Sequence, residues 1–314
     1  MTRRPFAAIA RVMASRSQPL APALPVAVAA LAIALFSTMD ALMKGLALAI
    51  GTYNALLWRT LIGATIAGAI FFARRSAWPK RAAMRIHLIR GCMSSVMAIL
   101  FFWGLARVPM AQAIALAFVA PLIALYLAAI LLKEKIERGA ILASLLGLAG
   151  VLVILAGQAQ ADLGPQALRG SAAILGSAAL YAWNIILMRQ QAQVAAPLET
   201  AFFTSLIMGS CFLLLAPFLA VPPQSVHLPA ILSAALLAFV SLMLFAWAYA
   251  RAEAQRLAPV EYTGFLWAAV FGFFFFAEPV RPLTFIGAAM IVFACYMAAR
   301  PSRPASQPQV EAGA

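Results

Sequence analysis

Long apolar runs fill most of this chain, and short polar segments separate them. A helix that crosses a bilayer needs about 20 largely apolar residues, and ten runs in the chain approach or reach that length. The predicted spans are residues 24–49, 53–73, 86–106, 110–131, 139–156, 170–188, 198–219, 229–250, 258–277 and 282–299. The pattern therefore predicts an all-α integral membrane protein with ten transmembrane helices.

The second half of the chain repeats the first at a constant offset of 144 residues. The clearest matches are Phe101 with Phe245, Trp103 with Trp247, Arg107 with Arg251, Glu134 with Glu278, and Asp40 with Asn184. Each half holds an odd number of predicted spans, so the halves should lie upside down relative to each other. Secondary transporters use such inverted repeats to form a substrate site near the membrane midplane. We therefore expect two inverted five-helix repeats.

The repeat divides the chain into five parts. We expect a cytoplasmic tail (1–23), a first five-helix repeat (24–156), an external linker (157–169), a second repeat (170–299) and a disordered cytoplasmic tail (300–314).

Composition supports the membrane prediction and orients the chain. Hydrophobic residues make up 65% of it and charged residues 10%, whereas a soluble domain has about 25% charged residues. With the N-terminus inside, 18 of the 23 Lys and Arg fall on the cytoplasmic side or at cytoplasmic helix ends, and only Lys44 and Arg59 fall within spans. This asymmetry follows the positive-inside rule. The net charge of +14 thus indicates topology, with both termini cytoplasmic, and requires no nucleic acid.

Two structural features follow from small residues and prolines inside the runs. Gly139, Gly147 and Gly150 in one span and Gly287 in another favour close contacts between helices. Pro121 in the fourth span and Pro217 in the seventh are candidates to bend their helices. The three cysteines lie in apolar runs without paired spacing, so no disulfide, metal site or cofactor is predicted.

Ionisable side chains inside spans need a partner or a function, because burying them in lipid is costly. Asp40 and Lys44 lie one helical turn apart, and Arg59 lies about two turns into the next span. Two interpretations are open: a structural clamp between the first two helices, or a substrate-facing or gating cluster. Asp40 corresponds by repeat to Asn184, and Tyr181 lies one turn before it, which is the pattern expected of a shared central cavity.

Glu261 is the second candidate, near the cytoplasmic end of the ninth span. A buried carboxyl group without a cation is a candidate proton carrier. Alternatively, Glu261 is solvated at the interface or pairs with Arg256. Tyr262 and Trp267 follow it and, with Tyr181, are candidates to line a cavity; ordinary packing against lipid or helices explains them equally well.

With these residues in view, the chain resembles the ten-helix, two-domain EamA branch of the drug/metabolite transporter superfamily over residues 25–299. The resemblance rests on the two halves and on Lys44, Arg59, Pro121, Glu134 and Glu278. Residues 37–44, 57–60 and 261–267 are similar to a bacterial subgroup assigned as S-adenosylmethionine or riboflavin transporters. Glu261 stands where that subgroup usually has Asp.

We therefore expect a secondary transporter, not an enzyme, that moves a small organic metabolite across the bacterial inner membrane by alternating access. The expected partners are the lipid bilayer, the small-molecule substrate and a coupled proton at Glu261. The alternative is an integral-membrane enzyme acting on a lipid-linked substrate. That activity would need a cluster of His and carboxylate groups at a membrane face, whereas His87 and His227 lie at unrelated helix ends.

Overall fold

The computed structural model describes residues 23–132, 138–160, 164–192, 194–249, 251, 257 and 260–299, and these residues are almost entirely helical. The first half contributes α2 (Ala23–Ile50), α3 (Thr52–Ala73), α4 (Arg81–Leu105), α5 (Met110–Ala117), α6 (Ala120–Leu132) and α7 (Arg138–Gln160). The second half contributes α8 (Gly164–Ala192), α9 (Pro197–Leu219), the short 3-10 helix η1 (Ser225–His227), α10 (Leu228–Tyr249), α12 (Gly264–Phe276) and α13 (Pro282–Ala299).

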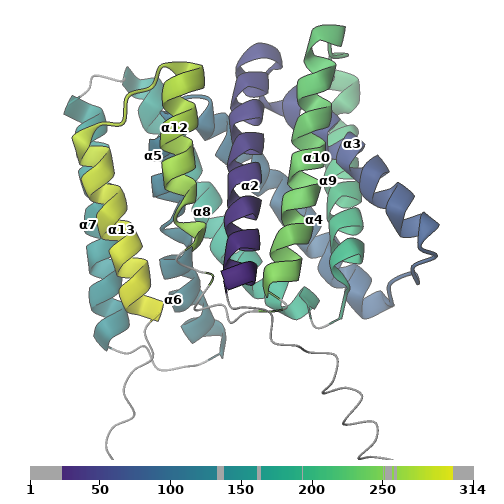
Figure 1. Ribbon diagram of the computed structural model, residues 1–314, viewed down its shortest axis with the longest axis horizontal. Helices are drawn as coiled ribbons and strands as arrows, with labels where there is room; N and C mark the ends of the chain where they lie inside the picture. Colours follow the sequence, from purple (N-terminus) through teal and green to yellow (C-terminus); the bar gives the residue numbers. More distant parts are fainter. Residues whose placement is uncertain are drawn as a thin grey trace, which may run out of the picture.

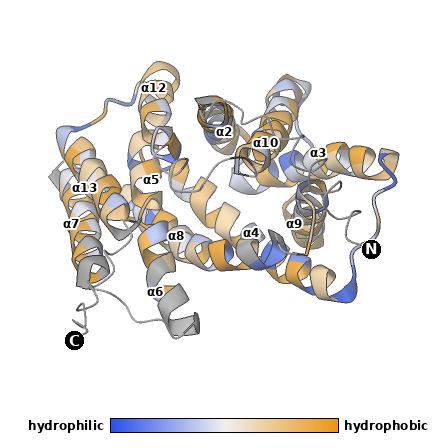
Figure 2. Cartoon of the chain, turned by 60° about the horizontal axis from the view of Figure 1, so that its bottom comes forward, coloured by the Kyte–Doolittle hydropathy of each residue, from blue (hydrophilic) through white to orange (hydrophobic). Residues whose placement is uncertain are grey.

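The ten predicted spans each find a helical counterpart among these elements, α5 and α6 together forming the fourth. Six of the described helices are long and apolar enough to cross a membrane, and four shorter apolar helices accompany them. The chain is thus a multi-pass membrane protein, as its hydropathy predicted. In Figure 2, most helices carry the colour of hydrophobic residues along much of their length, and hydrophilic residues occur where α3 connects to α4.

Helix boundaries repeat at the same interval as the sequence. The helices α4, α6 and α7 begin at residues 81, 120 and 138, and their counterparts η1, α12 and α13 begin at residues 225, 264 and 282. Each counterpart begins 144 residues later, so the interval found in the sequence also governs where helices start.

Helices of the two halves pair across their interface. The helix α2 packs on α10, α4 on α8, α3 on α9, and α7 on α13. The first two pairs are the same contact made twice, because α8 and α10 are the repeats of α2 and α4. Figure 1 shows α7 beside α13 at one edge of the bundle and α2 beside α10 near its centre.

A tryptophan–arginine pair closes the same helix in each half. The Arg107 guanidinium lies 3.6 Å from the Trp103 ring centre, and that of Arg251 lies 4.3 Å from the Trp247 ring centre. Each arginine also donates a hydrogen bond from Nη1 to the carbonyl oxygen of its tryptophan, at 2.8 Å and 3.2 Å. These contacts satisfy a carbonyl group at the helix end, which explains why the motif recurs.

The contacts predicted for Gly147, Gly150 and Gly287 are present. A Cβ atom on Gly150 would lie 2.7 Å from the carbonyl oxygen of Gly287, and one on Gly287 would lie 2.6 Å from that of Gly150. A Cβ atom on Gly147 would collide with the side chain of Leu122. Small residues therefore set the close approach of α7 to α13.

The connection between α7 and α8 differs from the prediction, and the connection between α2 and α3 depends on a glycine. The expected linker, residues 157–169, is mostly helical, because α7 extends to Gln160 and α8 begins at Gly164. Gly164 has a φ of +75°, and the proline after it suits the first turn of a helix. Gly51, with a φ of +80°, alone joins α2 to α3, a conformation that residues with a Cβ atom rarely adopt.

Candidate functional site

The fourth predicted span is interrupted in its middle. Phe118 and Val119 form a turn between α5 and α6, and Pro121 follows as the second residue of α6. Proline donates no backbone hydrogen bond and disfavours the helical conformation in the residue before it. The bend expected from Pro121 is therefore present as a break, two residues ahead of the proline.

A second break occupies the repeat-equivalent place. Tyr262 and Thr263, which lie 144 residues after Phe118 and Val119, form a turn immediately before α12. The two breaks meet, since the rings of Phe118 and Tyr262 pack edge to face with their centres 5.2 Å apart. Interrupted helices at membrane depth are the usual framework of transporter sites.

Glu261 lies directly before the second break and interacts with two tyrosine side chains. The Tyr249 hydroxyl donates a hydrogen bond to Oε1 of Glu261. Tyr181 interacts electrostatically with Glu261 and also with Arg90. The suggested pairing of Glu261 with Arg256 involves a residue outside the described part of the chain.

Asp40 is buried in α2, with 3% of its surface exposed, and Oδ1 has no hydrogen-bond partner among the described residues. Its electrostatic partner is Arg59 on α3. Nε of Arg59 is also buried without a partner in the described part of the chain, while Nη1 donates to Sδ of Met39 at 3.6 Å. The guanidinium lies 5.6 Å from the ring centre of Phe102. Of the predicted cluster of Asp40, Lys44 and Arg59, the structure therefore brings Asp40 and Arg59 into electrostatic contact.

Lys44 does not join that pair, although it lies one turn from Asp40. Its ammonium group forms an ion pair with Oε1 of Glu278 and donates to the carbonyl oxygen of Val108 at 2.8 Å. The other oxygen of Glu278 accepts a hydrogen bond from the backbone N–H of Met110, the first residue of α5, at 2.8 Å. We name Lys44, Glu278, Val108 and Met110 the Lys44–Glu278 clamp. It ties α2 to the two connections before α5 and α13, and the repeat-equivalent Glu134 lies outside the described residues.

Asn184 is buried in α8 and belongs to a chain of polar contacts that crosses between the halves. Its Oδ1 accepts a hydrogen bond from Nε of Arg90 at 3.1 Å. Nη1 of Arg90 donates to Oε1 of Gln191, whose amide nitrogen bonds to Nδ1 of His87. Nε2 of His87 lies 3.0 Å from Oε1 of Glu199. These five residues, from α4, α8 and α9, form what we call the Arg90 network.

Sequence reasoning missed most of this network. It counted Arg90 among the charges at cytoplasmic helix ends, whereas α4 begins at Arg81 and Arg90 is only 8% exposed. The missed signal is a polar and small stripe at helical spacing along α4, formed by His87, Arg90, Gly91, Ser94 and Ser95, all buried. Such a stripe inside an apolar helix marks the face turned towards other helices.

The remaining predicted residues are more open. Trp267 is 38% exposed and stacks on Phe271 of its own helix, with ring centres 5.7 Å apart. Tyr181 is 39% exposed. The structure thus groups Asn184 with Arg90, Asp40 with Arg59, and Tyr181 with Glu261, whereas the ring of Trp267 stacks within its own helix.

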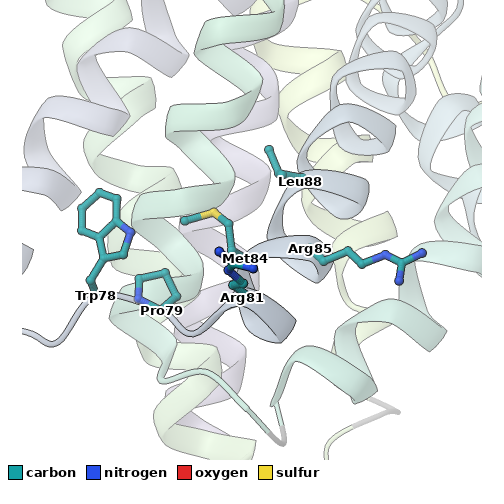
Figure 3. Close-up of a pocket in the computed structure, with 6 residues that line it drawn as sticks. All are labelled: Trp78, Pro79, Arg81, Met84, Arg85 and Leu88. Carbon is teal, nitrogen blue, oxygen red and sulfur yellow. The ribbon is translucent and has the colours of Figure 1, made fainter.

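A separate hollow lies on the other face of α4. It has a volume of about 350 Å³ and is lined by Trp78, Pro79, Arg81, Met84, Arg85 and Leu88 (Figure 3). Arg90 follows Arg81 by nine residues, or about 2.5 turns, and therefore faces the opposite side of the helix. This surface hollow does not open onto the Arg90 network.

Comparisons with known proteins agree with the helical repeat. The sequence profile of the EamA-like transporter family matches the chain twice, at residues 6–156 and 168–300. The two matches coincide with the two halves recognised from the offset of 144 residues.

Among curated proteins, the pseudopaline exporter CntI of Pseudomonas aeruginosa is 26% identical over 286 residues, covering 88% of this chain and 95% of the exporter. An uncharacterised transporter of Helicobacter pylori is 27% identical over 209 residues, covering 64% of this chain and 69% of that protein. A solved crystal structure matches 89% of this chain and 98% of its own length with a TM-score of 0.61 and 19% identity. This last likeness concerns the fold alone.

Proposed function

Because the chain belongs to the EamA-like transporter family, we propose that it is a secondary transporter for a small organic metabolite. It works by alternating access across the inner membrane of a bacterium, with both termini cytoplasmic. The observation that carries this proposal is the meeting of two broken helices at the repeat-equivalent residues Phe118 and Tyr262. In this arrangement, the site lies between the halves and rocking of one half against the other exposes it to each side in turn.

An inverted relation of the halves is part of the proposal. Among the described residues, each half supplies five apolar helical segments when α5 and α6 are counted as one. An odd number of spans reverses the direction in which the second half enters the bilayer. The positive-inside distribution of Lys and Arg supports the cytoplasmic placement of both termini.

The proposed site combines the sequence candidates with their contacts. Asp40 and Arg59 bind or gate charged parts of the substrate, and Lys44 gates through its ion pair with Glu278. Tyr181, Asn184, Tyr262 and Trp267 line the path. Glu261, beside the second break and bonded to Tyr249, carries a coupled proton.

The substrate class is a vitamin, a cofactor or an amino-acid-like compound. The resemblance of residues 261–267 to a subgroup assigned to S-adenosylmethionine or riboflavin supports the first compounds to test. The related pseudopaline exporter supports testing efflux before uptake. Since the family and these relatives are transporters, transport takes precedence over the alternative of a membrane enzyme.

The test is transport by purified protein reconstituted in vesicles, against riboflavin, S-adenosylmethionine and aromatic amino acids, with and without a pH gradient. We expect saturable counterflow of one compound, and its loss in Asp40→Asn and Glu261→Gln. Ser210→Ala is the matched control, because this exposed hydroxyl bonds only to Leu206 of its own helix in the described structure.

Two results would contradict different parts of the proposal. Full transport by both amide variants would overturn the site assignment and leave the transporter in place. Absence of flux for every compound, in protein that unfolds cooperatively, would overturn the proposed substrate class.

A further inference from the structure

Arg90 carries a charge that the described protein does not neutralise. The residue is only 8% exposed, and its two hydrogen-bond acceptors, Asn184 and Gln191, are neutral amides. Among the described residues, no carboxylate lies within ion-pair distance of it. Burying a cation without an anion lowers the stability of the fold, because the charge loses its hydration. Such a group is therefore a candidate for a functional role.

The other buried charges have partners of opposite sign. Lys44 pairs with Glu278. Arg59 lies in the field of Asp40. Arg90 is the exception among the described cations inside the helical bundle, and the group that acts electrostatically on it is the Tyr181 phenol.

The geometry leaves part of the guanidinium free to bind. A guanidinium has five N–H donors in a planar fork, and the described contacts engage Nε and Nη1 only. The remaining donors include both hydrogens of Nη2. A planar edge of this kind matches the two oxygens of a carboxylate.

Building on the proposed transport function, we infer that Arg90 binds the carboxylate of the transported compound, which is therefore an organic acid or a zwitterion. Asn184 and Gln191 hold the guanidinium in place from α8, across the interface between the halves. Tyr181 interacts electrostatically with both Arg90 and Glu261, so it connects the inferred carboxylate site to the proposed proton carrier.

This site extends the transport proposal in a specific way. A carboxylate bound at Arg90 lies at the contact between α4 of the first half and α8 of the second, which Arg90 makes through Asn184 and Gln191. Occupancy then bears on the interface that has to open during alternating access, and the free energy of that contact becomes available to the transport cycle.

The test measures ligand binding to the full-length protein in detergent by calorimetry. The probes are tryptophan and phenylalanine with their carboxamides, S-adenosylmethionine, and riboflavin, which has no carboxylate. At least one carboxylate probe is expected to bind the wild type while its amide binds about tenfold more weakly or worse. Arg90→Gln is expected to lose a similar factor for the acid and little for the amide.

Arg85→Gln is the matched control, since it removes an exposed arginine from the opposite face of the same helix (Figure 3). It should bind the acid as the wild type does. Arg90→Gln should unfold at the same or a higher temperature than the wild type, because it removes an unneutralised buried charge; a purely structural arginine would give a clear decrease. If Arg90→Gln does not fold, Arg90→Lys carries the test, and unchanged binding in it overturns the inference.

The outcomes separate this inference from the transport proposal. Wild-type protein that binds no carboxylate probe, binds amides equally well, or keeps its affinity in Arg90→Gln overturns the role of Arg90. Flux of riboflavin alone does the same while supporting transport. Carboxylate binding that depends on Arg90, without flux of the bound compound in vesicles, supports the site and contradicts transport of that compound.

Discussion

The Lys44–Glu278 clamp and the Arg90 network both join the two halves, but they treat a buried cation in opposite ways. In the clamp, Lys44 faces a carboxylate and a backbone carbonyl group. In the network, Arg90 faces two neutral amides. The charge of Lys44 is neutralised within the clamp, whereas the charge of Arg90 is not neutralised by its partners and can bind an anion.

The two sites also lie at different ends of one helix. Arg90 lies in the third turn of α4, and Val108 of the clamp follows soon after the end of that helix. The helix from Arg90 to Leu105 measures about 22 Å, at 1.5 Å per residue. Alternating access needs contacts on the two sides of the membrane to open in turn. We therefore expect the Lys44–Glu278 clamp to stabilise one conformation and the Arg90 network to respond to ligand.

The largest effect is expected from locking the interface beside the Arg90 network. Sγ of Cys92 on α4 lies 3.6 Å from Sγ of Cys211 on α9, and both thiols are free. A disulfide requires about 2.05 Å between the sulfurs, so mild oxidation should join them with a small shift. If α4 and α9 separate during the cycle, transport in vesicles should fall to near zero and return after reduction.

Mass spectrometry of the oxidised protein measures the cross-link, and Cys211→Ser is the control that cannot form it. Since Cys295 is buried elsewhere, against the carbonyl oxygen of Phe118, it remains in all variants. Cross-linked protein that transports at the full rate would mean that α4 and α9 do not separate beside the Arg90 network. The proposed difference between the network and the Lys44–Glu278 clamp would then be wrong.

The second prediction concerns the clamp. Glu278→Gln should lower the free energy of unfolding by about 3–5 kcal/mol, the usual cost of leaving one member of a buried ion pair without its partner. The amide oxygen can still accept the bond from Met110, while an amide nitrogen, which is a donor, replaces the oxygen that accepts from Lys44. Thermal unfolding in detergent measures the effect.

The double variant Lys44→Met/Glu278→Gln provides the control for this charge effect. Methionine occupies the repeat-equivalent position 188, so it is a side chain that this fold accommodates there. Most of the lost stability should return in the double variant. A double variant as unstable as Glu278→Gln would show that the cost does not come from the unpaired Lys44.

The sequence allowed the helices and the pairs of small residues to be predicted, but not the partners of buried charges. Hydropathy locates the apolar segments of the chain and so predicts the spans well. It placed the start of the third span at residue 86, however, whereas α4 begins at Arg81. Spacing along one helix suggested that Lys44 joins Asp40, but Glu278, 234 residues away, takes it instead. Such pairings depend on how the halves pack, and periodicity carries no information about that.

The repeat supplied what local patterns could not, because it marked equivalent places in the two halves. Asp40 and Asn184 are both buried, and Phe118 and Tyr262 both lie at helix breaks. Arg90 escaped this reasoning, since the equivalent residue is Ala234. The sequence was thus least informative at positions where the two halves differ. Arg90, which we infer binds the ligand, is at such a position.

The smallest effect is expected at the outer member of the Arg90 network. Glu199 stands in the first turn of α9, is 15% exposed and contacts His87 at 3.0 Å. Glu199→Gln should cost about 1 kcal/mol or less, since it weakens a helix-dipole contact and one hydrogen bond to Nε2 of His87. Unfolding temperatures of Glu199→Gln and Glu278→Gln, measured side by side, test this ranking. A loss at Glu199 as large as that at Glu278 would mean that the network, like the clamp, depends on the charge of a carboxylate, and Arg90 would then no longer be the member of the network that lacks an anion.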